Sequence, residues 1–330
     1  MGPFEYVRAG DVAAAVRLVS ADAGADYLAG GTTQLDLMLK DGVIAPERLV
    51  DITRLPLRGV TARDGTLFVG ALTTMEELAA DPMVAEQIPF VRQALLAGAS
   101  PQLRNMATIG GNLLQRTRCR YFRDREVTAC NKRAPGSGCA AVRGPARMHA
   151  ILGASEHCIA LHASDLCVPL VALDAVVDIQ GADGSRSVPL TEFYVLPGDR
   201  PDIENVLEHG ELLTGVRIPL SAVGRRSGYL KVRDRASYEF ALASAAAALL
   251  IEDGAIVQAR LALGGVGTMP WRALEAEEVL HGAPATGRTF QAAAQVALGD
   301  PFTVAGTAFK VELAERTIIR ILQTVSGVRS

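Results

Sequence analysis

Cysteine is scarce in this sequence, and the five cysteines that are present include no C-x-x-C pair. The ligand spacings of ordinary zinc fingers and bacterial ferredoxins are therefore absent. An odd number of cysteines in a chain too large to need covalent cross-links also argues against a disulfide framework. Long hydrophobic runs are missing too. The most apolar stretch, Phe240–Ile251, is shorter than the roughly 18 residues that a membrane span needs, so we expect it to be a buried element.

A strong charge of one sign and targeting signals are also lacking. The net charge of −3 gives no general attraction to nucleic acid or to anionic membranes. The N-terminal residues show no secretory signal, and Tyr6 stands where a myristoylation motif requires Ser or Thr. No Ser-His-Asp arrangement, HExxH motif or carboxylate pair suited to acid–base work stands out. The sequence therefore predicts no catalytic residues on this chain.

What the chain does contain is ample material for packed cores, with 49% hydrophobic and 21% charged residues. Its 330 residues exceed one typical core and indicate two or three domains. The first 55 or so residues alternate helix, strand, helix and strand, which predicts a small parallel sheet. These elements are a helix from Asp11 to about Ser20, a strand ending at Gly30-Gly31, a helix containing Leu35–Leu39 and a strand over Arg48–Thr53.

Hairpins and isolated helices are expected in the next part of the chain. Asp64-Gly65 and Asp183-Gly184 are turn sequences that favour hairpins. A capping box at Thr74–Glu77 predicts that a helix begins there. Ala107–Leu114 is expected to be a strand interrupted by two glycines, and Leu166–Leu190 is expected to run as strand, turn and strand.

The last third of the chain has a different order of elements. Ser221–Gly228 is the best candidate for a linker. Three strands are expected after it, with an Asp253-Gly254 turn between two of them, and the residues from Pro270 onward are expected to be helical. Strands followed by helices, rather than interleaved with them, predict a separate α+β domain.

Two Gly-Gly sequences follow apolar stretches and are candidates for ligand binding. In Leu28–Leu35 (LAGGTTQL) the glycines and two threonines lie between a strand and a helix, where free backbone N–H groups favour a phosphate. A tight turn with threonine as helix cap explains the same residues. Ala107–Asn112 (ATIGGN) is the second pair, and glycine there marks close approach of a ligand or of another backbone. Together the two loops suggest a dinucleotide such as FAD.

The cysteines gather in a segment without clear periodicity. Cys119, Cys130, Cys139 and Cys158 are separated by ten, eight and eighteen residues, and Arg116–Arg133 carries seven basic and two acidic residues. Basic side chains around four thiolates would suit an anionic iron–sulfur cluster. Ala134–Gly138 supplies a turn that would fold Cys139 back toward Cys130. A solvated basic loop with incidental thiols, or a zinc site that includes His149 or His157, remains open.

Several motifs together resemble one known family. AGGTTQLDLMLKDG, VGALTTMEEL, ATIGGNLLQRTRC and the late LKVRDRASYEFALASAA, LALGGVG, PWRA and FKVELA resemble, in order, the FAD-binding subunit of the xanthine dehydrogenase family of molybdenum hydroxylases. The cysteine segment and RMHAILGASEHCIALHASD most resemble the FAD and iron–sulfur subunits of bacterial periplasmic aldehyde oxidoreductases.

This resemblance implies an α+β fold with two domains. Residues 1–222 would form an FAD-binding domain of the vanillyl-alcohol-oxidase or PCMH type, in two α/β subdomains of about 1–55 and 56–222 with a cluster-binding insertion at about 115–165. Residues 228–330 would form a C-terminal domain of the CO dehydrogenase flavoprotein type, a three-stranded antiparallel sheet with helices.

The resemblance also implies site residues. Leu28, Ala29, Gly30, Gly31, Thr32, Thr33 and Gln34 would surround the FAD pyrophosphate, with Thr108, Gly111 and Asn112 as the opposite wall. Asp165 would bind the ribityl or ribose region, and Lys231 would lie near the flavin ring, which Tyr238 would cover. Cys119, Cys130, Cys139 and Cys158 would hold a 4Fe-4S cluster. Cys167, in an apolar strand, would be a buried structural thiol.

The implied activity is electron transfer within an oxidoreductase. A large molybdenum-cofactor subunit would oxidise an aldehyde, and a small subunit with two 2Fe-2S clusters would pass the electrons to FAD on this chain and on to an external acceptor. Export to the periplasm would depend on a signal carried by a partner. The alternatives are a standalone FAD-dependent reductase of related fold and a zinc-binding scaffold subunit.

Overall fold

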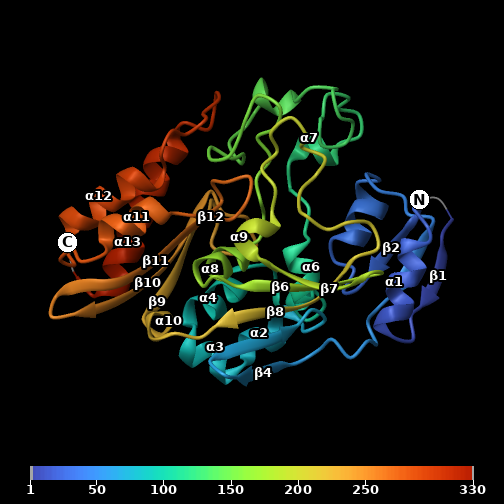
Figure 1. Ribbon diagram of the computed structural model, residues 1–330. Helices are drawn as coiled ribbons and strands as arrows, with labels where there is room; N and C mark the ends of the chain where they lie inside the picture. Colours follow the sequence, from blue (N-terminus) through green and yellow to red (C-terminus); the bar gives the residue numbers. More distant parts are fainter. Residues whose placement is uncertain (1–2, 329–330) are drawn as a thin grey trace.

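The protein is built on three β-sheets that follow one another along the chain, as Figure 1 shows for the computed structural model. The structure describes residues 3–328. Within these residues no helix combines the length and apolar character needed to cross a membrane. The N-terminal sheet (blue) and the C-terminal helices (orange and red) lie at opposite ends of the molecule, and the sheet of β4–β8 lies between them.

The first sheet is small and parallel, as the sequence predicts. Its strands are β1 (Glu5–Arg8), β2 (Ala25–Leu28) and β3 (Arg48–Asp51), in the order β1-β3-β2. Helix α1 (Val12–Ser20) begins after Asp11, whose carboxylate accepts from the N–H of Ala14. Strand β1 was not predicted. The expected helix near Leu35 is a single π-helical turn, η1 (Asp36–Lys40).

The second sheet is antiparallel and has five strands in the order β4-β5-β8-β6-β7. These are β4 (Val60–Arg63), β5 (Thr66–Gly70), β6 (Val176–Gly181), β7 (Gly184–Pro189) and β8 (Leu212–Pro219). Both predicted Asp-Gly turns close hairpins here. The largest core packs this sheet against helices, among them α2 (Met75–Ala80), α4 (Pro89–Ala97) and α8 (Cys167–Ala172). Helix α2 begins with the predicted capping box.

Two predicted strands in this region are wrong, because the segments are helices. Ala107–Leu114 contains α6 (Ile109–Leu113), which starts where the Thr108 hydroxyl accepts from the N–H of Gly111. Cys167, expected in a strand, begins α8, all of whose residues are buried. Short apolar runs do not distinguish a buried strand from a buried helix, which is the physical reason for both errors.

The third sheet is antiparallel and has four strands, so the predicted three-stranded sheet is corrected. Its order is β12-β11-β10-β9. The strands are β9 (Ser227–Val232), β10 (Ala243–Glu252), β11 (Ala255–Gly264) and β12 (Trp271–Arg272). Strand β12 has only two residues, which pair with Leu263 and Ala262, and the alternation that marks a strand needs a longer run. The helices α11 (Leu274–Leu280), α12 (Gly287–Ala297) and α13 (Phe309–Ser326) supply much of its core.

The remaining elements are short. The predicted linker contains α10 (Ala222–Arg225) and the start of β9, so the chain there is ordered into elements. Others are α3 (Pro82–Gln87), α5 (Pro101–Arg104) and α9 (Leu190–Phe193). The cysteine segment between α6 and α8 has little regular structure, with only α7 (Arg120–Arg123) and the 3-10 turn η2 (Ala140–Val142). It forms the green region at the top of Figure 1.

Candidate functional site

The first Gly-Gly loop leaves a row of backbone donors without backbone acceptors. Strand β2 ends at Leu28, and Gly31 has a φ of 72°, a conformation that favours glycine. Within the described chain, none of the N–H groups from Ala29 to Gln34 donates to a backbone carbonyl. The Gln34 side chain is held by Asp26, to which it donates at 3.1 Å. The predicted residues Leu28–Gln34 therefore form a short stretch of backbone that can bind an anion.

The second Gly-Gly loop lies directly against the first. A Cβ added to Gly30 would stand 1.9 Å from the carbonyl oxygen of Met106, immediately before Ala107 and Thr108. Gly111 is different, because a Cβ there would meet only the Thr108 hydroxyl, at 3.0 Å. The two predicted loops are thus brought together, with backbone contact at Gly30 and open space beside Gly111.

Because of this contact, we expect Gly30→Ala to lower the free energy of unfolding by about 1–3 kcal/mol, the usual effect of overpacking. Denaturant unfolding of the variant measures it. Gly10→Ala is the matched control, since nothing lies within 4 Å of its added Cβ. Equal stability of both variants would contradict the close contact between the loops.

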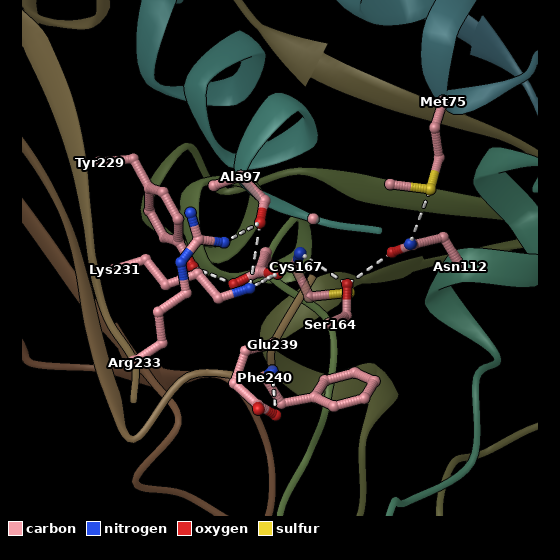
Figure 2. A network of polar contacts seen from close by, with 12 residues as sticks. Met75, Ala97, Asn112, Ser164, Cys167, Tyr229, Lys231, Arg233, Glu239 and Phe240 are labelled. Atoms are coloured by element: carbon pink, nitrogen blue, oxygen red, sulfur yellow. Dashed lines mark hydrogen bonds and ion pairs between the residues drawn. The ribbon is translucent and has the colours of Figure 1, made fainter. Parts of the chain in front are cut away.

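Asp165 and Lys231 form a buried ion pair beside this region. Lys231 Nζ lies 2.7 Å from Asp165 Oδ2, and the Tyr229 hydroxyl donates to Asp165 Oδ1 at 2.5 Å. Burial, together with the Asp165 carboxylate, raises the pKa of Tyr229 well above its usual value, which keeps its proton in place. Lys231 and Arg233 both donate to the carbonyl of Ala97, as Figure 2 shows.

Asn112 connects the second loop to the segment that carries Asp165. The Ser164 hydroxyl donates to Asn112 Oδ1 at 2.6 Å and accepts from the N–H of Cys167. Figure 2 shows Asn112, Ser164 and Cys167 in one line of contacts next to Lys231. The structure therefore gathers residues from α6, the end of the cysteine segment and β9, which were predicted separately.

Phe240 is an aromatic residue beside the first Gly-Gly loop, which it reaches through Arg118. Tyr238 is 56% exposed, and the guanidinium of Arg235 lies over its ring, 5.8 Å from the centroid. Phe240 is half-buried and lies under the guanidinium of Arg118, 5.2 Å from the ring centroid. Arg118 also donates to the Thr33 hydroxyl at 3.2 Å. No local sequence motif indicates Phe240 or Arg118, because their contacts join segments far apart in the sequence.

The four predicted cluster cysteines line one pocket. The lining of this pocket consists of Cys119, Cys130, Cys139 and Cys158 together with Tyr121, Phe122, Ala129, Asn131, Lys132, Ala141, His157 and Ala160. Cys167 lies elsewhere, fully buried in α8 with its sulfur 3.0 Å from the Tyr194 hydroxyl. The structure thus separates the four cysteines from the fifth.

A β-bridge between Cys130 and Cys139 helps to form this pocket. The Asn131 N–H donates to Gly138 O at 2.7 Å, and the Ala140 N–H donates to Ala129 O at 2.9 Å. Gly136 and Gly138 have positive φ, which allows the predicted turn at Ala134–Gly138 to reverse the chain. The prediction that this turn folds Cys139 back toward Cys130 is confirmed.

The chemistry of the sulfurs is set by burial. Burial raises the pKa of Cys119 to about 12 and also raises that of Cys158, so both sulfurs are protonated thiols in the free chain. A metal centre would have to displace these protons. Across residues 3–328, no group of three or more Cys, His, Asp or Glu side chains is arranged around a single ion position.

Most of the positive charge near the cysteines is used in other contacts. Arg123 pairs with Asp36 and Asp41, and Arg118 pairs with Asp36. Arg133 donates to three backbone carbonyls. Lys132 is the one basic residue of Arg116–Arg133 that lines the pocket. These three arginines join the segment to the N-terminal part of the chain and to itself.

Two protein-family models match nearly all of this chain. The FAD binding domain in molybdopterin dehydrogenase matches residues 2–221, and the CO dehydrogenase flavoprotein C-terminal domain matches residues 228–325. This chain belongs to the FAD-binding subunits of the molybdenum hydroxylase family. It is therefore an oxidoreductase subunit that binds FAD.

The similar proteins and solved structures match most or nearly all of this chain. The chain is 45% identical to the aldehyde oxidoreductase FAD-binding subunit PaoB of Escherichia coli, over 98% of both chains. It is 30% identical to the carbon monoxide dehydrogenase medium chain of Afipia carboxidovorans, over 85% of this chain and 81% of that one. The carbon monoxide dehydrogenase of Hydrogenophaga pseudoflava has the same fold, with a TM-score of 0.76, 26% identity and coverage of 99% and 98%.

Proposed function

We propose that this chain carries FAD and a 4Fe-4S cluster as the electron-transfer subunit of a heterotrimeric aldehyde oxidoreductase. The observation that carries the proposal is the meeting of Cys119, Cys130, Cys139 and Cys158 around one pocket, while Cys167 lies apart. The full-length similarity to the E. coli aldehyde oxidoreductase subunit supports the aldehyde as substrate of the complex.

The cysteine pocket fits a cluster better than a single ion. A cubic 4Fe-4S cluster takes one thiolate at each iron, so the four sulfurs stand around a cube and need not converge on one point. Four cysteines that line one pocket offer one thiolate for each iron. In the proposal Cys119, Cys130, Cys139 and Cys158 hold the cluster, which supplies one-electron transfer. Lys132, which lines the pocket, lowers the pKa of Cys158 against the effect of burial.

The FAD site is proposed to use the two loops and the ion pair. The free N–H groups of Ala29–Gln34 would bind the pyrophosphate, with Thr108, Gly111 and Asn112 on the other side. Asp165, fixed by Lys231 and Tyr229, would accept from a hydroxyl of the ribityl or ribose group. Lys231 would lie near the flavin ring. When bound, FAD supplies a carrier that exchanges one or two electrons.

The ion pair gives a testable stability effect. Lys231 and Asp165 side chains are 4% and 11% exposed, so Asp165→Asn leaves a buried ammonium without its counter-charge. We expect a loss on the order of 3 kcal/mol in the free energy of unfolding. Asp64→Asn is the control, because Asp64 and its partner Arg63 are more than 80% exposed and such a pair contributes about 0–1 kcal/mol. Denaturant unfolding measures the free energy of unfolding of both variants. A similar loss of stability in the two would contradict the stabilising role of the Asp165–Lys231 pair.

The partners are proposed from the same similarity. A large subunit with the molybdenum cofactor would oxidise the aldehyde to a carboxylic acid with water as oxygen source, and a small subunit with two 2Fe-2S clusters would pass electrons to this chain. An external acceptor would then take them from FAD. Anaerobic addition of an aldehyde to the purified complex should bleach the flavin absorbance. A flavin that stays oxidised while the partner clusters are reduced would contradict this route.

The proposed location is the periplasm, reached by co-export with a partner that carries the signal. Cell fractionation with this chain tagged tests it directly. We expect the chain in the periplasmic fraction when the partner's signal is intact and in the cytoplasm when that signal is deleted. A cytoplasmic chain in both strains would overturn this part of the proposal.

A further inference from the structure

His149 contacts Cys119, one of the four proposed cluster ligands, but is not itself one of those ligands. Its ring is buried, and Nε2 lies 3.2 Å from the sulfur of Cys119. The ring also lies against Tyr121, with centroids 5.9 Å apart. His149 follows a turn in which its N–H donates to Ala146 O at 2.9 Å. The imidazole is thus held at the side of the cysteine pocket.

The chemistry of the Cys119 sulfur and of the His149 ring decides which of the two donates in this hydrogen bond. A sulfur that binds iron has no proton, so it can only accept. The other ring nitrogen, Nδ1, is buried and has no hydrogen-bond partner among the described residues. A buried N–H without an acceptor is costly, which favours the proton on Nε2, where the sulfur lies. His149 is therefore suited to donate to Cys119 when that sulfur is a ligand.

Lys310 fixes the backbone of His149 from the other domain. Lys310 belongs to α13, yet its side chain is fully buried. Its Nζ donates to His149 O at 2.7 Å and to Gly265 O at 2.6 Å. A buried lysine is uncommon unless it is paired, and here two carbonyls take the place of a carboxylate. The amine of Lys310 thereby connects the C-terminal helix, the end of β11 and the residue that contacts Cys119.

We propose that His149 is a hydrogen-bond donor to the Cys119 sulfur that raises the reduction potential of the 4Fe-4S cluster, and that Lys310 is the positioning residue for His149. This inference rests on the proposed cluster. Hydrogen bonds to cluster sulfurs favour the reduced, more negative state and so shift the potential upward. The C-terminal domain, through Lys310, would then take part in setting the potential of a centre that lies in the insertion.

A redox titration of the purified complex, followed by the electron paramagnetic resonance signal of the reduced cluster, tests the inference. We expect His149→Leu to make cluster reduction about tenfold less favourable, which is a fall of about 59 mV for a one-electron couple. His149→Gln, whose amide keeps a donor, should stay near the wild-type potential. The flavin potential, measured in the same titration, should not move.

His157→Leu is the matched control. His157 lines the same pocket but is exposed, and its ring makes no hydrogen bond to a cysteine sulfur in the described structure. The same substitution there should leave the cluster potential unchanged. Lys310→Met should shift the potential in the same direction as His149→Leu, and the double variant should show less than the sum of the two shifts, because both act through one contact.

The outcomes separate this inference from the proposed function. A complex without a 4Fe-4S signal would overturn both. A wild-type signal with an unchanged potential in His149→Leu, or an equal fall in His149→Leu and His149→Gln, would overturn the role of His149 alone. Loss of the cluster in both His149 variants would also overturn the role of His149. His149→Gln keeps a hydrogen-bond donor, so a cluster lost in that variant too would show that His149 does not act through its donor.

Discussion

Replacement of Cys130 by serine is expected to remove nearly all iron from this chain, from about four atoms per chain in the wild type to less than about one. Cys130 is buried and lines the pocket, and its backbone forms a β-bridge with that of Cys139. A serine hydroxyl is a poor ligand for iron because it stays protonated, and three remaining thiols leave one corner of the cluster without a protein ligand. Iron assay and the visible absorbance of the purified chain measure the effect.

Cys167→Ser is the control for this prediction. Cys167 is as deeply buried, but its sulfur contacts Tyr194 and lies outside the pocket. The same change of one atom there should leave the iron content at the wild-type value and alter only local stability. Loss of iron in Cys167→Ser, with iron kept in Cys130→Ser, would contradict the proposed set of cluster ligands.

The second large effect is expected at the FAD site. Gly111→Ala should weaken FAD binding by on the order of tenfold or more, which is about 1.4 kcal/mol. The added methyl group would enter the open space beside Gly111, where the pyrophosphate is proposed to approach, while the protein itself offers only the Thr108 hydroxyl as a near contact. Fluorescence titration of the FAD-free chain with FAD gives the dissociation constants of wild type and variant.

Gly287→Ala is the matched control for Gly111→Ala. Gly287 is also a helical glycine, at the start of α12, and nothing lies within 4 Å of its added Cβ. Its FAD affinity should equal that of the wild type. If Gly111→Ala bound FAD with wild-type affinity and kept its fold, the proposed approach of the cofactor to α6 would be wrong.

Local signals in the sequence predicted many of the elements correctly. The caps at Asp11 and Thr74 and the Asp-Gly turns at residues 64–65, 183–184 and 253–254 are formed by neighbouring residues, so their physics is visible in a short stretch. The errors fall where local patterns are ambiguous. Helices α6 and α8 occupy short apolar runs, and β12 is a two-residue strand before a helix.

The candidate site shows the same division between local and distant contacts. The Gly-Gly loops and the turn before Cys139 were predicted from adjacent residues. Spacing alone does not decide whether Cys158 or Cys167 is the fourth cluster ligand. The family resemblance implies Cys158, and the fold places Cys158 in the pocket of the other three cysteines and the Cys167 sulfur at Tyr194. The contacts of Arg118 with Phe240 and of Lys310 with His149 join segments more than a hundred residues apart, so no sequence motif announces them.

The most direct test of the account is a count of metal and flavin in the full chain, purified without oxygen from cells supplied with iron. We predict one FAD and about four iron atoms per chain, with the broad visible absorbance of an iron–sulfur cluster beneath the flavin bands. A chain that holds FAD but carries zinc, or no metal, in place of iron would contradict the central claim.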